Sequence, residues 1–285
     1  MGVNIENCFT KFPIMPSAFV LIDKPPGITS FKALNAIKKQ LGTKRVGHAG
    51  TLDMSASGLI VAAVEKCTRL LPYVEAQDKV YAFDLHLGIL TDTLEPTGNI
   101  LKQDSNVTIT AEKLNDVLQT FVGEIEQIPP AYSAIKIDGK RASDLALKGQ
   151  NIELRPRKIT IYELKILSGY QLYCKCSKGT YIRSLARDIA EKLGTYGVAG
   201  NIRRLAIGDI SVEQANGKPI LPQELLKWET ANVSEEDAKK ILNGVPVTGG
   251  QGLAISGNLV FVANNEQIIA VAELQNGYLV PKFLL

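Results

Sequence analysis

The 285-residue chain lacks the features that mark several large classes of protein. Its four cysteines, at positions 8, 67, 174 and 176, include no Cys-x-x-Cys pair, and there are only two histidines, so we expect neither a zinc site nor a disulfide framework. No uninterrupted apolar run approaches membrane-spanning length. The N-terminus has no basic segment followed by an apolar one, as a secretory signal would. These absences favour a soluble, cytoplasmic protein with reduced thiols.

Sequence motifs of several common enzyme chemistries are also absent. There is no Walker loop for nucleotide phosphates, no Gly-x-Gly-x-x-Gly fingerprint, no Gly-x-Ser-x-Gly elbow and no His-Glu-x-x-His motif. Nucleotide hydrolysis, hydride transfer and zinc-dependent hydrolysis therefore have no support. We expect neither a cofactor nor a metal.

The charge is nearly balanced, with 32 basic and 29 acidic residues and a formal net charge of +3. Several basic residues nevertheless occur in clusters, which are Lys38-Lys39, Lys44-Arg45, Lys140-Arg141, Arg155-Pro156-Arg157-Lys158 and Arg203-Arg204. Any one cluster could be an ordinary solvated face. Together they suggest one positive surface suited to a phosphate backbone.

The hydrophobic pattern predicts a mixed α+β domain followed by a small β module. Apolar runs predict strands at 18–23, 58–64, 79–88, 131–137, 157–167 and 171–177. Helical spacing predicts helices at 31–41, at 111–121 and at 180–193, and a short helix that ends at Gly149. In the first of these, Ser30 would be the N-cap and Gly42 would end the helix. We expect an irregular leader at 1–17, a main domain at 18–230 and the module at 231–285.

Residues 47–58, GHAGTLDMSASG, look like a polar, glycine-rich loop placed before a core strand. Gly47, Gly50 and Gly58 would let the backbone approach a ligand closely. Asp53 is the only carboxylate in this stretch, and the strand behind it would be a rigid support for a reactive group. The alternative is that Asp53 simply closes an Asx-turn.

Three other residues are candidates for a site, each with a structural alternative. Arg183 falls in the first turn of a predicted helix, where the macrodipole disfavours a cation unless an anion is near, although a solvated Arg beside Arg187 is also possible. Tyr81 shares a strand face with Phe83 and is as compatible with the core as with a site. His48 could stack on a base or lie in a turn, bonded to the backbone.

Several blocks of this sequence resemble the bacterial tRNA pseudouridine synthases that modify the T-loop uridine, the tRNA pseudouridine synthase B family. GHAGTLDMSASG resembles the signature loop of that family. The other blocks occur in the same order, and they are DKPPGITS, KVYAFDLHLGILTDTLEPTG, QIPPAYSAIKIDGKRA, CSKGTYIRSLARDIAEKLG and IRRLAIG. Together they cover roughly residues 18 to 210, and an ordered set of this kind is highly specific.

The resemblance implies an α+β pseudouridine-synthase fold, with a central, largely antiparallel mixed sheet, flanking helices and a C-terminal PUA-like module. It implies isomerisation of uridine to pseudouridine at tRNA position 55, in which the base leaves its stack before the C–N bond is exchanged for a C–C bond. The substrate would be the tRNA T-stem-loop, and we expect a monomer without a guide RNA or an obligatory protein partner.

The same resemblance implies the roles of individual residues. Asp53 would be the catalytic nucleophile or base, Arg183 would pair with its carboxylate, and Tyr81 would stack on the flipped uracil. Ile202 would line the pocket and Lys24 would support it. The residues expected to contact RNA are His48, Lys44, Arg45, Lys140, Arg141, Tyr181, Arg203 and Arg204. No second acid is evident, which argues against a two-carboxylate glycosidase.

The chain departs from the family pattern directly after Asp53. Met54-Ser55-Ala56-Ser57 stands where the family usually has Pro-Leu-Ala-Thr, and the missing proline predicts a more mobile loop. Ala49 and Ser143 replace a usual threonine and a usual aromatic residue. Two other readings compete with a stand-alone enzyme: a catalytically silent tRNA-binding protein, and the guide-RNA-dependent relatives of archaea and eukaryotes.

Overall fold

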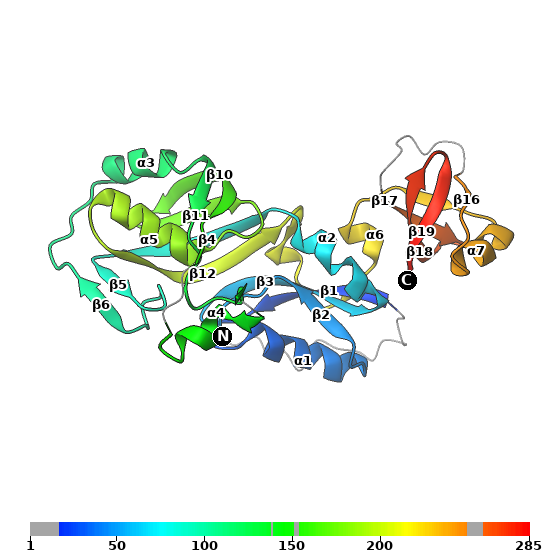
Figure 1. Cartoon of the computed structure of the whole chain (residues 1–285), viewed down its shortest axis with the longest axis horizontal. Helices are drawn as coiled ribbons and strands as arrows, with labels where there is room; N and C mark the ends of the chain where they lie inside the picture. Colours follow the sequence, from blue (N-terminus) through cyan, green and yellow to red (C-terminus); the bar gives the residue numbers. More distant parts are fainter. Residues whose placement is uncertain (1–16, 138, 151–153, 250–258) are drawn as a thin grey trace.

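The computed structural model describes residues 17–137, 139–150, 154–249 and 259–285 (Figure 1). The predicted leader therefore lies outside the described residues except for Ser17, which opens a strand. Cys8 also lies outside them.

A large mixed sheet forms the centre of the protein. It consists of β1 (Ser17–Lys24), β2 (Val46–Ala49), β3 (Ser57–Glu65), β4 (Lys79–Leu87), β7 (Gly123–Gln127), β10 (Arg157–Ser168), β11 (Gln171–Cys176), β12 (Gly197–Ile207), β13 (Ile210–Ser211) and β14 (Pro219–Ile220). Within the described residues these ten strands run in the order β14-β1-β3-β12-β4-β11-β10-β7, with β13 beside β12 and β2 beside β3. Among the described strands of this sheet, only β3 and β12 pair in parallel. The predicted α+β fold with a largely antiparallel mixed sheet is confirmed.

Helices and short turns cover this sheet. They are α1 (Ser30–Leu41), the 3-10 turn η2 (Lys66–Leu70), α2 (Leu71–Glu75), α3 (Ala111–Gln119), α4 (Ala142–Ala146), α5 (Ile182–Leu193), η3 (Val212–Gln214) and α6 (Pro222–Leu225). The hairpins β5 (Ile89–Thr91)–β6 (Ile100–Gln103) and β8 (Lys136–Ile137)–β9 (Lys140–Arg141) project from the connections. Alternate residues of β3 enter different clusters: Ile60 packs with α3 and α5, whereas Leu59 and Val61 pack with η2 and α2.

Helix α1 begins one residue earlier than its predicted cap implies. Thr29, not Ser30, is the N-cap, and its hydroxyl accepts a hydrogen bond from the Lys32 amide. Ser30 is the first helical residue and is buried, and its hydroxyl forms hydrogen bonds with the backbone of Leu52 in the neighbouring loop. Gly42 ends the helix at φ +64°, as predicted.

Only the end of the strand predicted at 131–137 is a strand. The structure has β8 at Lys136–Ile137, while residues 131–134 form bends. These bends arise because the backbone is used elsewhere: the Ser133 amide donates to Ala131, and the Tyr132 carbonyl accepts from Arg183.

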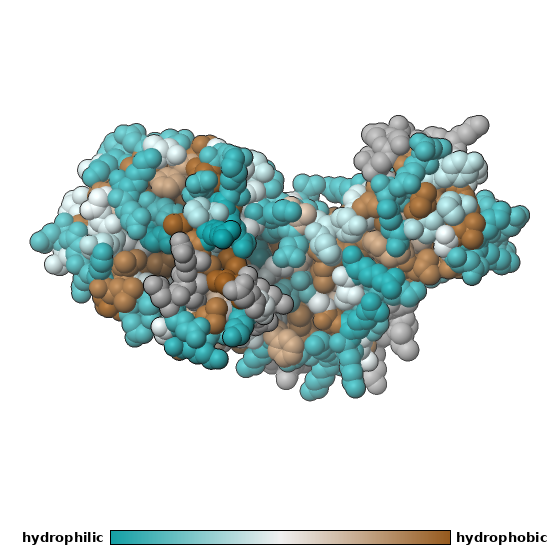
Figure 2. All heavy atoms as spheres, in the orientation of Figure 1, coloured by the Kyte–Doolittle hydropathy of each residue, from teal (hydrophilic) through white to brown (hydrophobic). Residues whose placement is uncertain are grey.

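The C-terminal region forms a second sheet. It contains β15 (Thr230–Asn232), β16 (Val247–Thr248), β17 (Leu259–Asn264), β18 (Gln267–Gln275) and β19 (Tyr278–Leu284), with α7 (Glu235–Leu242) packed against it. Strand β15 spans residues on both sides of the predicted domain boundary at 230/231. The boundary itself stays a prediction. Figure 1 shows this sheet at one end of an elongated molecule, and Figure 2 shows a notch in the outline beside it, with hydrophilic residues over most of the visible face.

Candidate active site

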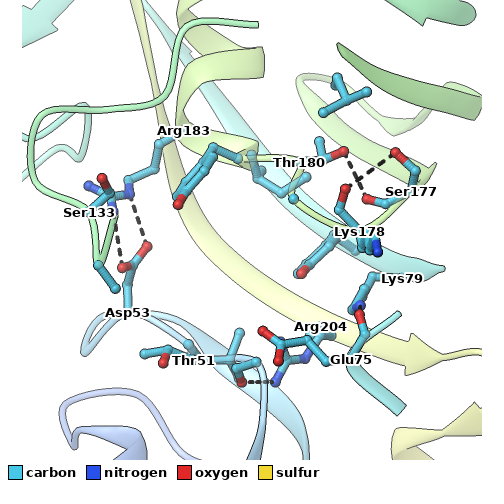
Figure 3. A pocket seen from close by; sticks show the side chains of 18 of the residues that line it. Thr51, Asp53, Glu75, Lys79, Ser133, Ser177, Lys178, Thr180, Arg183 and Arg204 are labelled. Atoms are coloured by element: carbon cyan, nitrogen blue, oxygen red, sulfur yellow. Dashed lines mark hydrogen bonds and ion pairs between the residues drawn. The ribbon is translucent and has the colours of Figure 1, made fainter. Parts of the chain in front are cut away.

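An open cavity of about 830 Å³ lies against the central sheet. The loop at 50–56, α2, β4, β12 and the segment 177–183 supply its lining. Figure 3 shows Asp53 and Arg183 at one end, and Glu75, Lys79 and Arg204 at the other. The cavity therefore gathers residues from most of the blocks that the sequence singles out.

Asp53 and Arg183 form a two-pronged ion pair. Arg183 Nε lies 2.9 Å from Asp53 Oδ2, and Arg183 Nη2 lies 3.0 Å from Asp53 Oδ1. The same guanidinium donates to the carbonyls of Thr93 and Tyr132, at 2.8 and 2.9 Å. The arginine side chain is only 5% exposed and the aspartate 39%, so the pair is fixed on the protein side while the carboxylate faces solvent. These partners explain how a cation is tolerated in the first turn of α5.

The residues on either side of Asp53 are held by buried side chains. The Ser30 hydroxyl donates to the Leu52 carbonyl and accepts from the Leu52 amide, at 3.1 and 3.0 Å. Lys24 is fully buried, and its ammonium donates to the carbonyls of Pro25 and Ile28 and, at 3.4 Å, to that of Met54. Burial lowers the pKa of Lys24, which the charge of Asp53 partly offsets. Lys24 is thus placed to support the loop, as the resemblance implies.

Arg204 holds the start of the same loop. It donates from Nε to the Leu59 carbonyl at 2.7 Å and from Nη2 to the Gly50 carbonyl at 3.1 Å. With only 1% exposure, it is not part of an exposed basic surface, and that part of the sequence prediction is wrong. A guanidinium with five donors can satisfy two buried carbonyls and still line the cavity.

Glu95 is a second acid at the site, which the sequence reasoning missed. Its Oε1 lies 3.6 Å from Arg183 Nε, and its Oε2 accepts a 2.6 Å hydrogen bond from the Ser55 hydroxyl. The expectation that no second carboxylate is near is therefore wrong. Glu95 lies in a polar turn 42 positions after Asp53, and only the fold brings the two acids to one arginine.

Tyr81, Ile202 and Tyr181 shape the apolar part of the cavity. Tyr81 packs against the core cluster of Phe83 and also lines the cavity, and its role in stacking on a base stays a prediction. Burial raises the pKa of its hydroxyl. Two residues of β12, Asn201 and Ile202, stand opposite one residue of β4 in a β-bulge, where Asn201 has φ +47°. The bulge places Ile202 at the cavity.

Tyr181 is the N-cap residue of α5 and is locked by Gln127. The Gln127 amide donates to the Tyr181 carbonyl at 3.2 Å, and its oxygen accepts from the Tyr181 amide at 2.8 Å. Burial raises the pKa of the Tyr181 hydroxyl. Tyr181, two residues before Arg183, is thereby held in place at the cavity wall.

Five of the other predicted RNA contacts do not line this cavity, and they are His48, Lys44, Arg45, Lys140 and Arg203. His48 belongs to β2 rather than to a loop and is half-buried, because residues 46–49 pair with β3, so the loop proper covers only 50–56. Burial lowers the pKa of His48. Lys44, Arg45 and Lys140 are exposed. Arg203 is paired with Asp23 through contacts of 2.9 and 2.7 Å. Arg141 lies in β9, and its side chain is outside the described part of the chain.

Within residues 17–137, 139–150, 154–249 and 259–285, no three His, Cys, Asp or Glu side chains gather as they would around a metal ion. None of the helices in this part of the chain has the length and apolarity needed to cross a membrane.

Comparison with known proteins identifies relatives of this chain. Residues 38–182 match the TruB family pseudouridylate synthase (N terminal domain). The tRNA pseudouridine synthase B of Caldanaerobacter subterraneus subsp. tengcongensis is 38% identical over 237 residues, which is 78% of this chain and 82% of that protein. The Aquifex aeolicus protein of the same name is 36% identical over 287 residues, covering 93% of this chain and 98% of the relative.

A solved structure shares the fold at lower identity. A Cbf5-Nop10-Gar1 complex contains a chain that matches with a TM-score of 0.66 and 22% identity, covering 94% of this chain and 84% of that one. The sequence relatives decide the family, and the chain belongs to the TruB family of pseudouridylate synthases.

Proposed function

We propose that the protein converts the T-loop uridine of tRNA, position 55, into pseudouridine, acting alone and without a cofactor. The observation that carries the proposal is the Asp53–Arg183 ion pair at an open cavity, in a chain whose relatives are named tRNA pseudouridine synthase B. In this pair the buried Arg183 guanidinium orients the Asp53 carboxylate, and the carboxylate remains accessible to a substrate in the cavity.

The reaction needs no electron donor or acceptor. The bond between ribose C1′ and uracil N1 breaks, a bond between C1′ and C5 forms, C5 loses a proton and N1 gains one. The product is an isomer of the substrate, so residues that hold the base and stabilise charge are sufficient.

The target base must leave its stack to reach Asp53. The ring of Tyr81 provides a face for a pyrimidine, and Ile202 provides an apolar wall beside it. Base–aromatic stacking contributes about 1–3 kcal/mol per base. Asp53 then acts as nucleophile on the base or the sugar, or as the base that removes a sugar proton; each route uses the same oriented carboxylate.

A transcript of the T-stem-loop with tritium at C5 of uridine tests the proposal directly. Each conversion releases one C5 proton, so wild-type protein releases tritium and forms pseudouridine. We expect Asp53→Asn to lower the rate by ~10³-fold or more while keeping RNA affinity, because the amide preserves shape but supplies neither nucleophile nor base.

Asp209→Asn is the matched control, since Asp209 is an exposed acid paired with Lys227. Turnover like wild type in Asp53→Asn would refute the assignment. A wild-type protein that binds the RNA without releasing tritium would instead be the silent tRNA-binding protein.

A further inference from the structure

The cavity contains two buried cations that the proposed chemistry leaves unused. A third buried cation, Arg183, is already paired with the Asp53 carboxylate. Lys79 is 6% exposed and Arg204 is 1% exposed, and both line the cavity. Within the described residues, neither forms an ion pair with a carboxylate. The Lys79 ammonium donates to the carbonyls of Glu75 and Gln77. The Arg204 guanidinium donates to those of Leu59 and Gly50 and also interacts with the Tyr81 hydroxyl.

Both cations lie beside the predicted base-stacking ring. Lys79 and Tyr81 are alternate residues of β4 and therefore share one face of the sheet. Arg204 stands opposite Tyr81 in the pairing of β12 with β4. Figure 3 shows Lys79 and Arg204 together at the end of the cavity away from Asp53.

Uncompensated cations in a buried position are unfavourable. The pKa of Lys79 is lowered to about 8, mainly by burial and next by the charge of Arg204, against smaller opposing effects of Glu75, Cys176 and Asp78. An anion that entered the cavity would relieve this cost. Lys24 shows the contrast: it is also buried and bound to carbonyls, but it is enclosed under the loop and does not line the cavity.

We propose that Lys79 and Arg204 form a phosphate subsite for the backbone phosphodiester adjacent to the flipped uridine. This inference rests on the proposed function, because it takes the substrate to be RNA. A nucleotide whose base stacks on Tyr81 carries a phosphate on each side of its ribose, and one of these enters the cavity with it. Lysine and arginine donors are the usual partners of phosphate oxygens.

The first test measures how RNA binding depends on salt. Binding is measured in the Asp53→Asn background, so that no turnover occurs. We expect Lys79→Met to reduce the slope of log affinity against log salt by about 0.7–0.9, the effect of one lost phosphate contact. Lys79→Arg should keep the slope, and Lys218→Met, at an exposed lysine, should leave it unchanged.

The second test removes the charge from the RNA instead. Stem-loops carry a neutral methylphosphonate at the phosphate on the 5′ or the 3′ side of the target uridine. We expect one of these positions to weaken binding to the protein with Lys79, and to weaken binding to Lys79→Met by a smaller factor, because only Arg204 then remains to contact the phosphate. Additive losses at both positions would overturn the subsite.

A third readout needs no change at Lys79, should Lys79→Met fail to fold. Bound phosphate would raise the pKa of Lys79 from about 8, so affinity should be constant below pH 8 and fall as the pH rises above it. The RNA with the neutral linkage should not show this fall. The charged or titratable groups facing Lys79 are Glu75, Asp78, Arg204 and Cys176, and they are present with both RNAs, so they cancel in the comparison.

The outcomes separate the two proposals. If wild-type protein converts the stem-loop but the salt slope of Lys79→Met and the pH response match the controls, the phosphate subsite alone is wrong. If wild-type protein neither binds nor converts the RNA, the proposed function itself fails.

Discussion

At the scale of single residues, the site depends on how one arginine is shared. Arg183 contacts Asp53 with two nitrogens, approaches Glu95 and donates to two carbonyls. A planar guanidinium can make these contacts at once, whereas an ammonium is a point charge. Orientation of the Asp53 carboxylate therefore requires arginine, not merely a positive charge.

Replacing Arg183 by lysine tests this. We expect Arg183→Lys to lower kcat by ~10²-fold with little change in KM, because a carboxylate displaced by about an ångström loses that much rate. Arg187→Lys is the control, since Arg187 pairs with Asp188 one turn away from the cavity. Single-turnover tritium release provides the measurement, and unchanged kinetics for Arg183→Lys would contradict the shared-arginine role.

At the scale of elements, the 50–56 loop is held by residues from several parts of the fold. Arg204 on β12 holds Gly50, Ser30 on α1 holds Leu52, and Lys24 on β1 holds Met54. The Ser55 hydroxyl adds a contact to Glu95 at the β5–β6 connection. These contacts restrain a loop that lacks the usual proline; its mobility stays a prediction.

The hydrogen bond from Ser55 to Glu95 is one of these restraints, and its effect on the reaction rate can be measured. We expect Ser55→Ala to lower kcat by about 2- to 10-fold, the effect of one hydrogen bond of 0.5–1.5 kcal/mol, with KM unchanged. Ser55→Thr should restore kcat. Ser57→Ala is the control, because the Ser57 hydroxyl forms no hydrogen bond within the described part of the chain. Equal rates for the two alanine variants would rule out the tether.

At the scale of the whole molecule, the second sheet is packed onto the first through aromatic contacts. The centre of the Trp228 ring lies 5.0 Å from that of Tyr73 in α2 and 5.1 Å from that of Phe261 on β17. Lys66 and Arg69 of η2 donate to the carbonyls of Leu285 and Leu284. Because α2 also lines the cavity, this contact joins the C-terminal sheet to the site.

Truncation of Phe261 tests how much this packing contributes to stability. Phe261 is fully buried in the cluster that joins the two sheets. We expect Phe261→Ala to lower the free energy of unfolding by about 3–5 kcal/mol, measured by urea denaturation. Tyr278→Ala, at a half-exposed ring of the same C-terminal sheet, should change it by no more than about 0.5 kcal/mol. A loss for Phe261→Ala as small as that of Tyr278→Ala would show that the sheets are not coupled there.

The sequence by itself determined the elements and the chemistry. Helical and alternating periods predicted α5 and β4, because side-chain burial repeats with the backbone period. The resemblance to the family implied the mixed, largely antiparallel sheet. Asp53 and Arg183 stood out because a carboxylate before a core strand and a cation at a helix N-terminus both need an explanation. The blocks that resemble the family pointed to the same two residues.

The tertiary structure decided which residues share a site. Glu95, Lys79 and the burial of Arg204 depend on contacts between segments far apart in the chain, and no local period reports such contacts. Such a contact between distant segments also explains why 131–135 is not a strand, since the Tyr132 carbonyl accepts a hydrogen bond from Arg183. The sequence shows that Arg204 and Lys44 are both cations, but only the fold determines that Arg204 is buried against carbonyls and that Lys44 is exposed to solvent.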